Sequence, residues 1–278
     1  AEPGNNRAGG GDGEGDAGMT YDTLDVSRDG RGVVTVRLTL PETHNALSAR
    51  MMDELTAVAG VLGGDESRVV VLTGTGKSFC AGGDLRWMRA QFDADAAGRA
   101  REGKRLAGML QALNTMPKPL VVRVQGNAFG GGVGLCCVAD VAIGADTALF
   151  GLTETRLGLI PATIGPYVIA RMGEGRARRV FMNARRFDAS EAVDLGILAR
   201  AVAVDDLDAA VEAEIIPYLA CAPGAVADAK RLARSLGPVI DETVIAATID
   251  ALAARWKGDE AVEGVGAFFD KRKPKWAK

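Results

Sequence analysis

The stretch Gly126-Asn-Ala-Phe-Gly-Gly-Gly-Val-Gly-Leu135 decides the fold, because it is a glycine-dense turn that directly follows the apolar run at residues 120–124. Glycine permits backbone conformations closed to other residues and lets a ligand approach the peptide N–H groups. A second such turn, Phe79-Cys-Ala-Gly-Gly-Asp-Leu85, follows the apolar run at residues 69–72. Two turns of this kind can each aim one N–H at a single oxygen, which is how a protein builds an oxyanion hole.

The composition excludes several classes of protein. The chain has 278 residues, of which 47% are hydrophobic, and a formal net charge of −3. It has ample apolar content for a core and no overall positive charge for a nucleic-acid partner. Its single histidine, His44, argues against a histidine metal site or a Ser-His-Asp triad, so no metal is expected. His44 itself is expected to serve local packing or hydrogen bonding.

The cysteines and the hydropathy pattern predict the compartment. The four cysteines show no CxxC spacing, and the adjacent Cys136 and Cys137 lie in an apolar segment typical of buried free thiols. We therefore expect a reducing, cytoplasmic location. No signal-peptide pattern is present, and no apolar run reaches about 18 residues, so no membrane partner is expected.

The chain divides into three parts by composition. Residues 1–18 are almost free of apolar side chains and are expected to be a disordered tail, since they cannot offset their ordering entropy. Residues 19–214 are expected to form the core with the binding site. Residues 215–278 are expected to form a helical C-terminal lobe, with alanine-rich faces suited to subunit packing.

Within the core, apolar strands alternate with helices. Alternating residues at 21–28 and 33–40, joined by Asp29-Gly30, predict a β-hairpin. Ser48 is the expected N-cap of the next helix. Further strands are predicted at 69–72, 120–124, 141–143 and 148–150. Helices are predicted at 106–113, 135–138, 190–197, 206–219, 223–235 and 239–256. This order is typical of an α/β domain.

One motif misleads. Gly74-Thr-Gly-Lys-Ser78 follows a strand and looks like the end of a phosphate-binding P-loop. The full pattern requires a glycine five residues before Gly76, where the chain has Val71. The motif also leads into Phe79-Cys80 rather than a clear helix. We therefore interpret it as an ordinary surface turn.

Glu154 is the candidate acid–base group, because its neighbours are apolar apart from two threonines and Arg156. A carboxyl in such surroundings tends to have a raised pKa, which suits it to move a proton near neutral pH. The alternative is a surface ion pair with Arg156. Similarly, Gly131 opens a predicted helix whose free N–H groups favour negative charge, whereas the alternative is tight helix packing.

These motifs together resemble the enoyl-CoA hydratase/isomerase (crotonase) superfamily, from about residue 20 onward. The matching segments are His44-Asn-Ala-Leu47, Phe79-Cys-Ala-Gly-Gly-Asp-Leu85, Gly126 to Leu135, Phe150-Gly-Leu-Thr-Glu154, Gly158-Leu-Ile-Pro161 and Ala192-Val-Asp-Leu-Gly-Ile197. The resemblance implies a spiral of ββα units with a C-terminal helical trimerisation region. It also implies a homotrimer or a hexamer built as a dimer of trimers.

The resemblance further implies the site residues. Gly83 and Gly131 would supply the oxyanion-hole N–H groups for a thioester enolate, with Glu154 as the catalytic carboxyl. Coenzyme A would be part of an acyl-CoA substrate, and no separate cofactor is expected. The residues expected to contact substrate or coenzyme A are Ala81, Asp84, Leu85, Arg86, Gly134, Phe268 and Lys271.

The chain departs from the family pattern at Gly134. Typical hydratases of the family carry a glutamate two residues after the glycine triplet, and a second glutamate that matches Glu154. Here the first is glycine, and no acidic residue lies between Gly126 and Ala139. This departure puts two-glutamate hydration of a straight-chain enoyl-CoA in doubt.

The segments Asp84-Leu-Arg-Trp-Met88 and 151–167 resemble bacterial hydratases of 3-methylglutaconyl-CoA and related γ-carboxylated enoyl-CoA esters, in leucine and acyclic terpene breakdown. A cation in the acyl pocket would stabilise a carboxylate on the acyl chain, and the candidates for this cation are Arg86, Arg89 and Arg156. For each, a solvated surface arginine is the alternative. Trp87 and Met88 would be pocket wall or core.

Three functions therefore compete. The first is a hydratase of a branched or γ-carboxylated enoyl-CoA. The second is a Δ3,Δ2-enoyl-CoA isomerase, in which the single base Glu154 moves a proton between two carbons. The third is a non-catalytic acyl-CoA-binding protein, which the missing glutamate permits and Glu154 argues against.

Overall fold

The computed structural model describes residues 20–277, so the predicted disordered tail lies outside the described residues. The strands are β1 (Leu24–Arg28), β2 (Val33–Leu38), β3 (Val69–Gly74), β4 (Ser78–Cys80), β5 (Leu120–Val124), β6 (Asn127–Phe129), β7 (Val141–Ala145), β8 (Leu149–Gly151), β9 (Arg186–Asp188) and β10 (Arg200–Val202). They form a six-stranded sheet in the order β1-β2-β3-β5-β7-β10 and a four-stranded sheet in the order β4-β6-β8-β9.

The two sheets are built by one repeated step. Each of β3, β5 and β7 pairs in parallel in the large sheet, and the chain then turns into β4, β6 or β8 of the small one. A helix follows before the next step. This repetition is the predicted spiral of ββα units, and it brings the turns after β4 and β6 next to each other.

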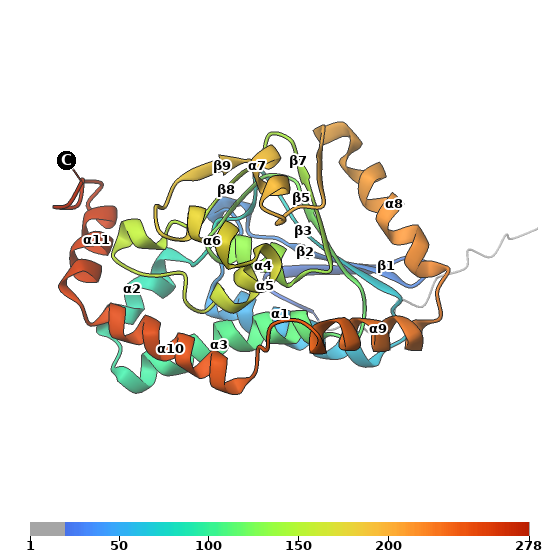
Figure 1. The fold of residues 1–278 in the computed structure, drawn as a ribbon, viewed down its shortest axis with the longest axis horizontal. Helices are drawn as coiled ribbons and strands as arrows, with labels where there is room; N and C mark the ends of the chain where they lie inside the picture. The colour runs from blue at the N-terminus through green and yellow to red at the C-terminus, as the bar shows by residue number, and fades with distance from the viewer. Residues whose placement is uncertain (1–19, 278) are drawn as a thin grey trace, which may run out of the picture.

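The helices cover both faces of the large sheet (Figure 1). They are α1 (Ala49–Gly64), α2 (Leu85–Asp93), α3 (Ala96–Thr115), α4 (Gly131–Val138), α5 (Gly165–Met172), α6 (Glu174–Phe181), α7 (Ala189–Asp194), α8 (Leu207–Leu219), α9 (Pro223–Ser235), α10 (Glu242–Trp256) and α11 (Asp259–Phe269), with 3-10 turns η1 (Pro41–Thr43), η2 (Glu154–Leu157) and η3 (Val204–Asp206). Helix α8 lies on one face, and α1 and α3 lie on the other. Helix α11 lies at the far end from α8.

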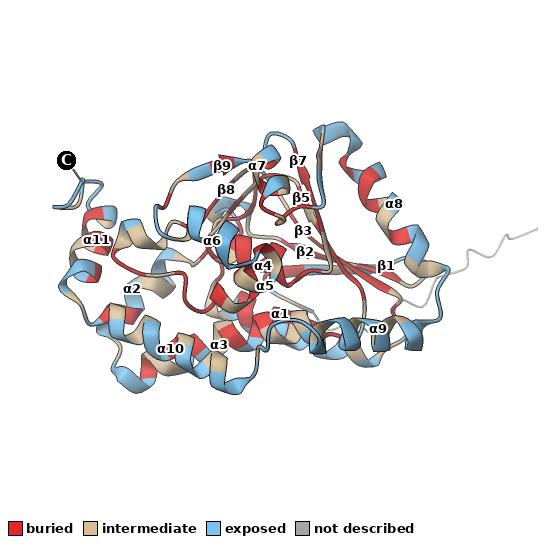
Figure 2. Ribbon diagram, viewed as in Figure 1, coloured by how far each residue is buried: buried red, intermediate tan, exposed pale blue. Residues whose placement is uncertain are grey.

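The core follows this layering. Val69, Val71 and Val121 face α8 and pack on its Leu207 and Val211, while the alternate strand residues face α1 and α3 in the larger cluster. Strands buried on both faces read as continuous apolar runs, which is why the short runs of valine were interpreted as strands. Figure 2 shows the buried residues concentrated in the sheets and on the inner faces of these helices.

Several local predictions are confirmed. Asp29 and Gly30 close the β1–β2 hairpin, and the Ser48 side chain caps α1 by accepting from the Met51 N–H at 3.2 Å. The segment after Gly74-Thr-Gly-Lys is β4 and not a helix, as expected for a turn that is no P-loop. Cys136 and Cys137 are buried free thiols.

Other elements were not predicted. The region after residue 190 is mostly helical, as expected, but it also contributes β10 to the large sheet and ends in a helix that was not predicted, α11. Within the described residues, no single helix has the length and apolar composition of a membrane span. Among the described residues, one pair of segments has that length and composition when the two are taken together: residues 204–219, which include α8, and α9. The two segments meet at a bend of 105°.

Helix α9 is attached in an unusual way, because none of its apolar side chains is buried (Figure 2). Its Lys230 side chain reaches inward instead. The Lys230 Nζ donates to the Lys118 carbonyl at 2.9 Å and pairs with the Asp140 carboxylate at 2.7 Å. Burial lowers the pKa of Lys230, and Asp140 opposes that shift. A charged contact, and not an apolar face, thus fastens α9 to the core.

Candidate active site

The two glycine turns meet as predicted from their repeated position. Gly82 has a φ of +91° and Gly130 a φ of +49°, conformations that glycine adopts without strain. A Cβ added to Gly82 would lie 3.5 Å from the Gly131 nitrogen, so the turns are in direct contact. Leu47 fixes the first turn, since its N–H donates to the Gly82 carbonyl at 2.7 Å.

The N–H groups of Gly83 and Gly131 are free for a ligand. Neither donates to an acceptor among residues 20–277. Gly131 is the first residue of α4, where N–H groups have no intrahelical partner and the helix dipole favours negative charge. Tight packing also requires glycine here, because a Cβ on Gly131 would lie 2.6 Å from the Leu47 Cδ1 and one on Gly132 would lie 2.2 Å from the Cys80 carbonyl oxygen.

Glu154 lies beside these turns at the start of η2. Its Oε1 would be 3.0 Å from a Cβ placed on Gly130, so the carboxyl borders the second turn. Its Oε2 is buried and has no hydrogen-bond partner among the described residues. Burial raises the pKa of Glu154 from 4.5 to about 7, opposed only in part by a backbone N–H. The carboxyl is thus poised to take up and release a proton near neutral pH.

The alternative of a surface ion pair does not hold in the structure. Arg156 is exposed, and no ion pair joins it to Glu154 or to another carboxylate in the described chain. The apolar surroundings of Glu154 therefore act on its pKa without a compensating cation.

A cavity of about 330 Å³ opens onto these groups. Its walls come from the two turns, from α2, from the segment after Glu154, and from α10 and α11. The lining residues are Leu47, Met52, Ala81, Gly82, Gly83, Leu85, Trp87, Met88, Leu106, Phe129, Gly130, Gly131, Thr153, Glu154, Arg156, Leu157, Leu159, Ile160, Pro161, Ala162, Thr163, Ile164, Arg186, Leu252, Trp256 and Phe268. Glu154 is the one acidic residue among them.

The residues predicted to form the site lie in three positions: in the lining of the cavity, beside it, or outside it. Those that line the cavity are Ala81, Gly83, Leu85, Gly131, Glu154 and Phe268. Asp84 lies beside it as the N-cap of α2 and accepts from the Arg86 and Trp87 N–H groups at 2.9 and 3.0 Å. Arg86 and Lys271 are exposed and lie outside the lining.

Gly134 does not line the cavity either, because Ile164 covers it. A Cβ on Gly134 would lie 2.7 Å from the Ile164 Cγ2. Ile164 itself lines the cavity. An apolar side chain from the segment before α5 thus occupies the place toward which a side chain at position 134 would project.

The arginines were predicted only in part. Arg156 lines the cavity, whereas Arg86 does not and Arg89 stacks 5.2 Å over the Phe269 ring. Arg186, which the sequence did not single out, lines the cavity from β9. Only the pairing of β8 with β9 brings it there, and no motif signals that pairing.

Trp87 and His44 differ in their position relative to the cavity. Trp87 lines the cavity, as one of its two interpretations expected, and its indole N–H donates to Glu102 at 2.6 Å. His44 lies outside the lining and contacts the Ser78 hydroxyl at 3.1 Å. Within residues 20–277, no group of three or more His, Cys, Asp or Glu residues could hold a metal ion.

Glycine turns with free N–H groups, beside a carboxyl with a raised pKa, define a site that can stabilise an enolate and transfer a proton. Comparison with known proteins agrees. Residues 28–278 match the enoyl-CoA hydratase/isomerase family model. The chain therefore belongs to the enoyl-CoA hydratase/isomerase family.

Individual relatives have similar length and fold. The chain is 32% identical over 263 residues to the "Probable enoyl-CoA hydratase echA8" of Mycobacterium bovis, covering 93% of this chain and 99% of the relative. A crystal structure of an enoyl-CoA hydratase from Shewanella pealeana is 39% identical, with a TM-score of 0.76 over 92% of this chain and 96% of the other. The structure of Pseudomonas aeruginosa AtuE is 38% identical, with a TM-score of 0.75 over 92% and 100%.

Proposed function

We propose that this protein is an enoyl-CoA hydratase that adds water across the α,β double bond of a branched or γ-carboxylated acyl-CoA, of the 3-methylglutaconyl-CoA type. The observation that carries the proposal is Glu154, whose pKa of about 7 places its proton transfer in the physiological range, directly beside two free N–H donors. Gly83 and Gly131 are the residues that would hold the thioester oxygen.

One carboxyl is sufficient for the complete addition. Ionised Glu154 takes a proton from water as its oxygen bonds to C3, and the electron pair of the double bond moves to the thioester oxygen as an enolate. The two glycine N–H groups stabilise that negative charge. Protonated Glu154 then gives its proton to C2, which restores the thioester and the ionised carboxyl. A pKa near 7 suits both steps, because the group must accept and donate equally well.

The residues that line the cavity support the proposal of a branched or carboxylated acyl chain. Apolar residues form most of the lining, which suits a branched hydrocarbon. Arg156 and Arg186 also line the cavity, and neither forms an ion pair with a carboxylate of residues 20–277. Two unpaired cations beside an apolar cavity favour a substrate that brings its own carboxylate.

A Δ3,Δ2-enoyl-CoA isomerase is the second candidate, and one observation favours it. Glu154 is the one acidic residue of the lining, and Ile164 covers Gly134. A single base can remove a proton from C2 of a 3-enoyl-CoA and return it at C4, with the intermediate dienolate held by the same two N–H groups.

Turnover in water enriched in heavy oxygen, followed by mass spectrometry, separates these candidates. A hydratase for a carboxylated chain labels the product of 3-methylglutaconyl-CoA strongly and that of crotonyl-CoA weakly. An isomerase labels neither and converts a 3-enoyl-CoA. Glu154→Gln should lower kcat for the preferred substrate by about 10²- to 10⁴-fold. The control is Glu174→Gln, at an exposed carboxylate of α6 outside the lining. Unchanged turnover in Glu154→Gln would contradict both candidates.

The setting of the enzyme is part of the same proposal. We infer a cytoplasmic enzyme of leucine or related branched-chain breakdown that assembles as a homotrimer or homohexamer. The exposed apolar side chains of α9 and the following loop support the assembly: Leu232 is 60%, Leu236 80% and Val239 70% exposed. Side chains of this size in one short segment are typical of a subunit contact.

A further inference from the structure

Arg186 reaches the cavity from the small sheet. It opens β9, which pairs antiparallel with β8, and Arg186 lies opposite Gly151. Its guanidinium carbon lies 5.1 Å from the centre of the Phe129 ring. Phe129 directly precedes Gly130, and both line the cavity. Arg186 is solvent-exposed, and its cation lies beside the turn that carries the free Gly131 N–H.

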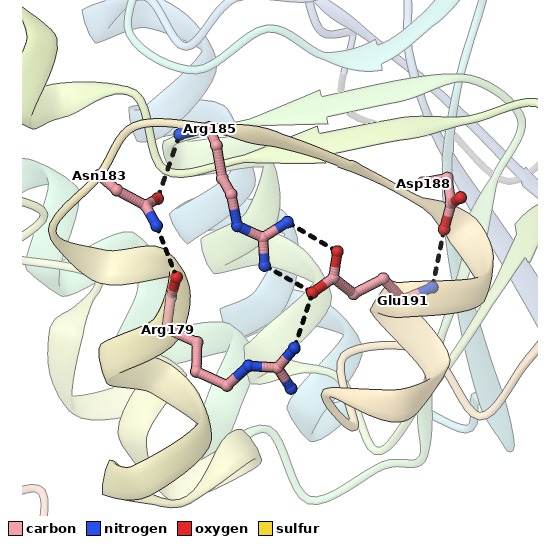
Figure 3. Close-up of polar contacts among 5 residues, drawn as sticks. All are labelled: Arg179, Asn183, Arg185, Asp188 and Glu191. Carbon is pink, nitrogen blue, oxygen red and sulfur yellow. Dashed lines mark hydrogen bonds and ion pairs between the residues drawn. The ribbon is translucent and has the colours of Figure 1, made fainter.

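The neighbouring residues explain why this cation has no acidic partner. Glu191 accepts from Arg185 at 2.7 Å and from Arg179 at 3.2 Å, so the nearby carboxylate is used by two other arginines (Figure 3). Figure 3 also shows Asp188 turned to the Glu191 N–H, which it caps at 2.8 Å. This network fixes the segment that enters β9 and leaves Arg186 without an ion pair in the described structure.

Arg156 approaches the cavity from another side. It belongs to η2, which packs against α11, and a Cβ on the adjoining Gly158 would lie 2.3 Å from the Glu260 carbonyl oxygen. Arg186, in contrast, lies over Phe129 in the sheet. The two cations thus reach the cavity from different elements, Arg156 from η2 and Arg186 from β9.

We propose that Arg186 is the specificity-determining residue that binds the carboxylate of the acyl chain. This inference rests on the proposed enoyl-CoA chemistry. A guanidinium stacked on an aromatic ring keeps its in-plane N–H donors free, and these match a carboxylate in a two-bond arrangement. Contact with the Phe129 ring restricts the Arg186 side chain, so less side-chain freedom is lost when the carboxylate binds.

The test compares two substrates that differ in one charge: an enoyl-CoA with a terminal carboxylate, and the methyl ester of the same chain. The readout is the ratio of their kcat/KM values. The wild type should favour the carboxylate, and Arg186→Gln should lower the ratio by about 10- to 100-fold, the loss expected for a charged hydrogen-bonded pair. Most of the loss should appear in KM, and Arg186→Lys should restore part of the ratio.

Two matched variants make the outcome decisive. Arg178→Gln, at an exposed arginine of α6 paired with Glu174, should leave the ratio unchanged. If Arg156→Gln lowers the ratio and Arg186→Gln does not, the assignment to Arg186 is overturned while the carboxylated substrate stands. If the wild type turns over both substrates equally, the carboxylate preference and the role of Arg186 both fail, but the hydratase activity stands. If it turns over neither, the proposed function itself fails.

Discussion

At the scale of single residues, Glu154, the proposed catalytic carboxyl, lowers the stability of the fold when it ionises. Its Oε2 is buried without a partner and its pKa is raised to about 7. Burial of a carboxyl without a nearby cation favours its protonated form over its ionised form. The same burial that makes it a useful proton carrier therefore disfavours the folded state once it ionises.

Stability should consequently depend on pH through this residue. The unfolded carboxyl ionises near 4.5 and the folded one near 7, so the unfolded state loses its proton first as the pH rises. Folding stability falls across this window and stays reduced above it. Glu154→Gln should raise the free energy of unfolding by about 1 to 3 kcal/mol at pH 8.5 and have little effect at pH 4.5. Urea unfolding at both values measures this, and an equal effect at the two would contradict it.

Gly134 gives a second prediction, because a Cβ there would lie 2.7 Å from the Ile164 Cγ2. Gly134→Ala should destabilise the fold by about 1 to 3 kcal/mol through this overlap, reduced by up to about 1 kcal/mol of helix propensity. Combining it with Ile164→Ala removes the overlapping methyl. The double variant should then lose less free energy of unfolding than the two single variants lose together, as measured in a double-mutant cycle. Simple additivity would show that the two positions do not compete for space.

The residues of the site differed in how far the sequence could reveal them. Glu154 and the glycine turns lie in motifs whose spacing carries their chemistry, and the structure brings them together. Arg186 could not be predicted, because its neighbour Phe129 is distant along the chain and only strand pairing joins them. The cover over Gly134 was hidden for a similar reason. The sequence shows that position 134 has no side chain, but it does not show that Ile164 occupies the space.

At the scale of elements, strands with long apolar runs could be predicted from the sequence, whereas the short strands β9 and β10 could not. Val69–Gly74 and Leu120–Val124 are buried along nearly their whole length, so their sequence alone identified them. Three-residue strands such as β9 and β10 have no such run, since their main contribution is backbone pairing with β8 and β7. Tertiary pairing, and not local propensity, creates them.

Helix α9 supplies a prediction at this scale. Lys230 is the contact that fastens it, with a side chain only 10% exposed and paired with Asp140. Lys230→Met should loosen α9 and lower the free energy of unfolding by about 1 to 3 kcal/mol, because the Lys118 carbonyl loses this donor and the Asp140 carboxylate loses its cation and keeps the Leu120 N–H. Hydrogen exchange should rise at residues 223–235.

Arg231→Gln is the matched control for Lys230→Met. Arg231 is the next residue of the same helix, is exposed, and pairs only with Asp228 within α9. Exposed pairs of this kind contribute little to stability. Equal hydrogen exchange in the two variants would show that α9 is held by something other than Lys230.

At the scale of the whole molecule, the apolar surface around α9 predicts association. Leu236 is 80% exposed and follows a helix with no buried residue. Leu236→Glu should therefore weaken self-association by about tenfold or more while leaving the fold intact. Sedimentation velocity measures the oligomeric state, and circular dichroism checks the fold. An unchanged oligomer would place the subunit contact elsewhere. Val61→Glu, at an exposed side chain of α1, is the control.

The cavity also has a consequence for the order in which the chain is made. The proposed catalytic carboxyl, Glu154, and both glycine turns precede Leu252, Trp256 and Phe268, which complete the wall. A nascent chain emerging from the ribosome thus has its reactive groups in place before the helices that exclude bulk water. Exclusion of bulk water from the proposed enolate therefore requires the helices that are synthesised last, α10 and α11.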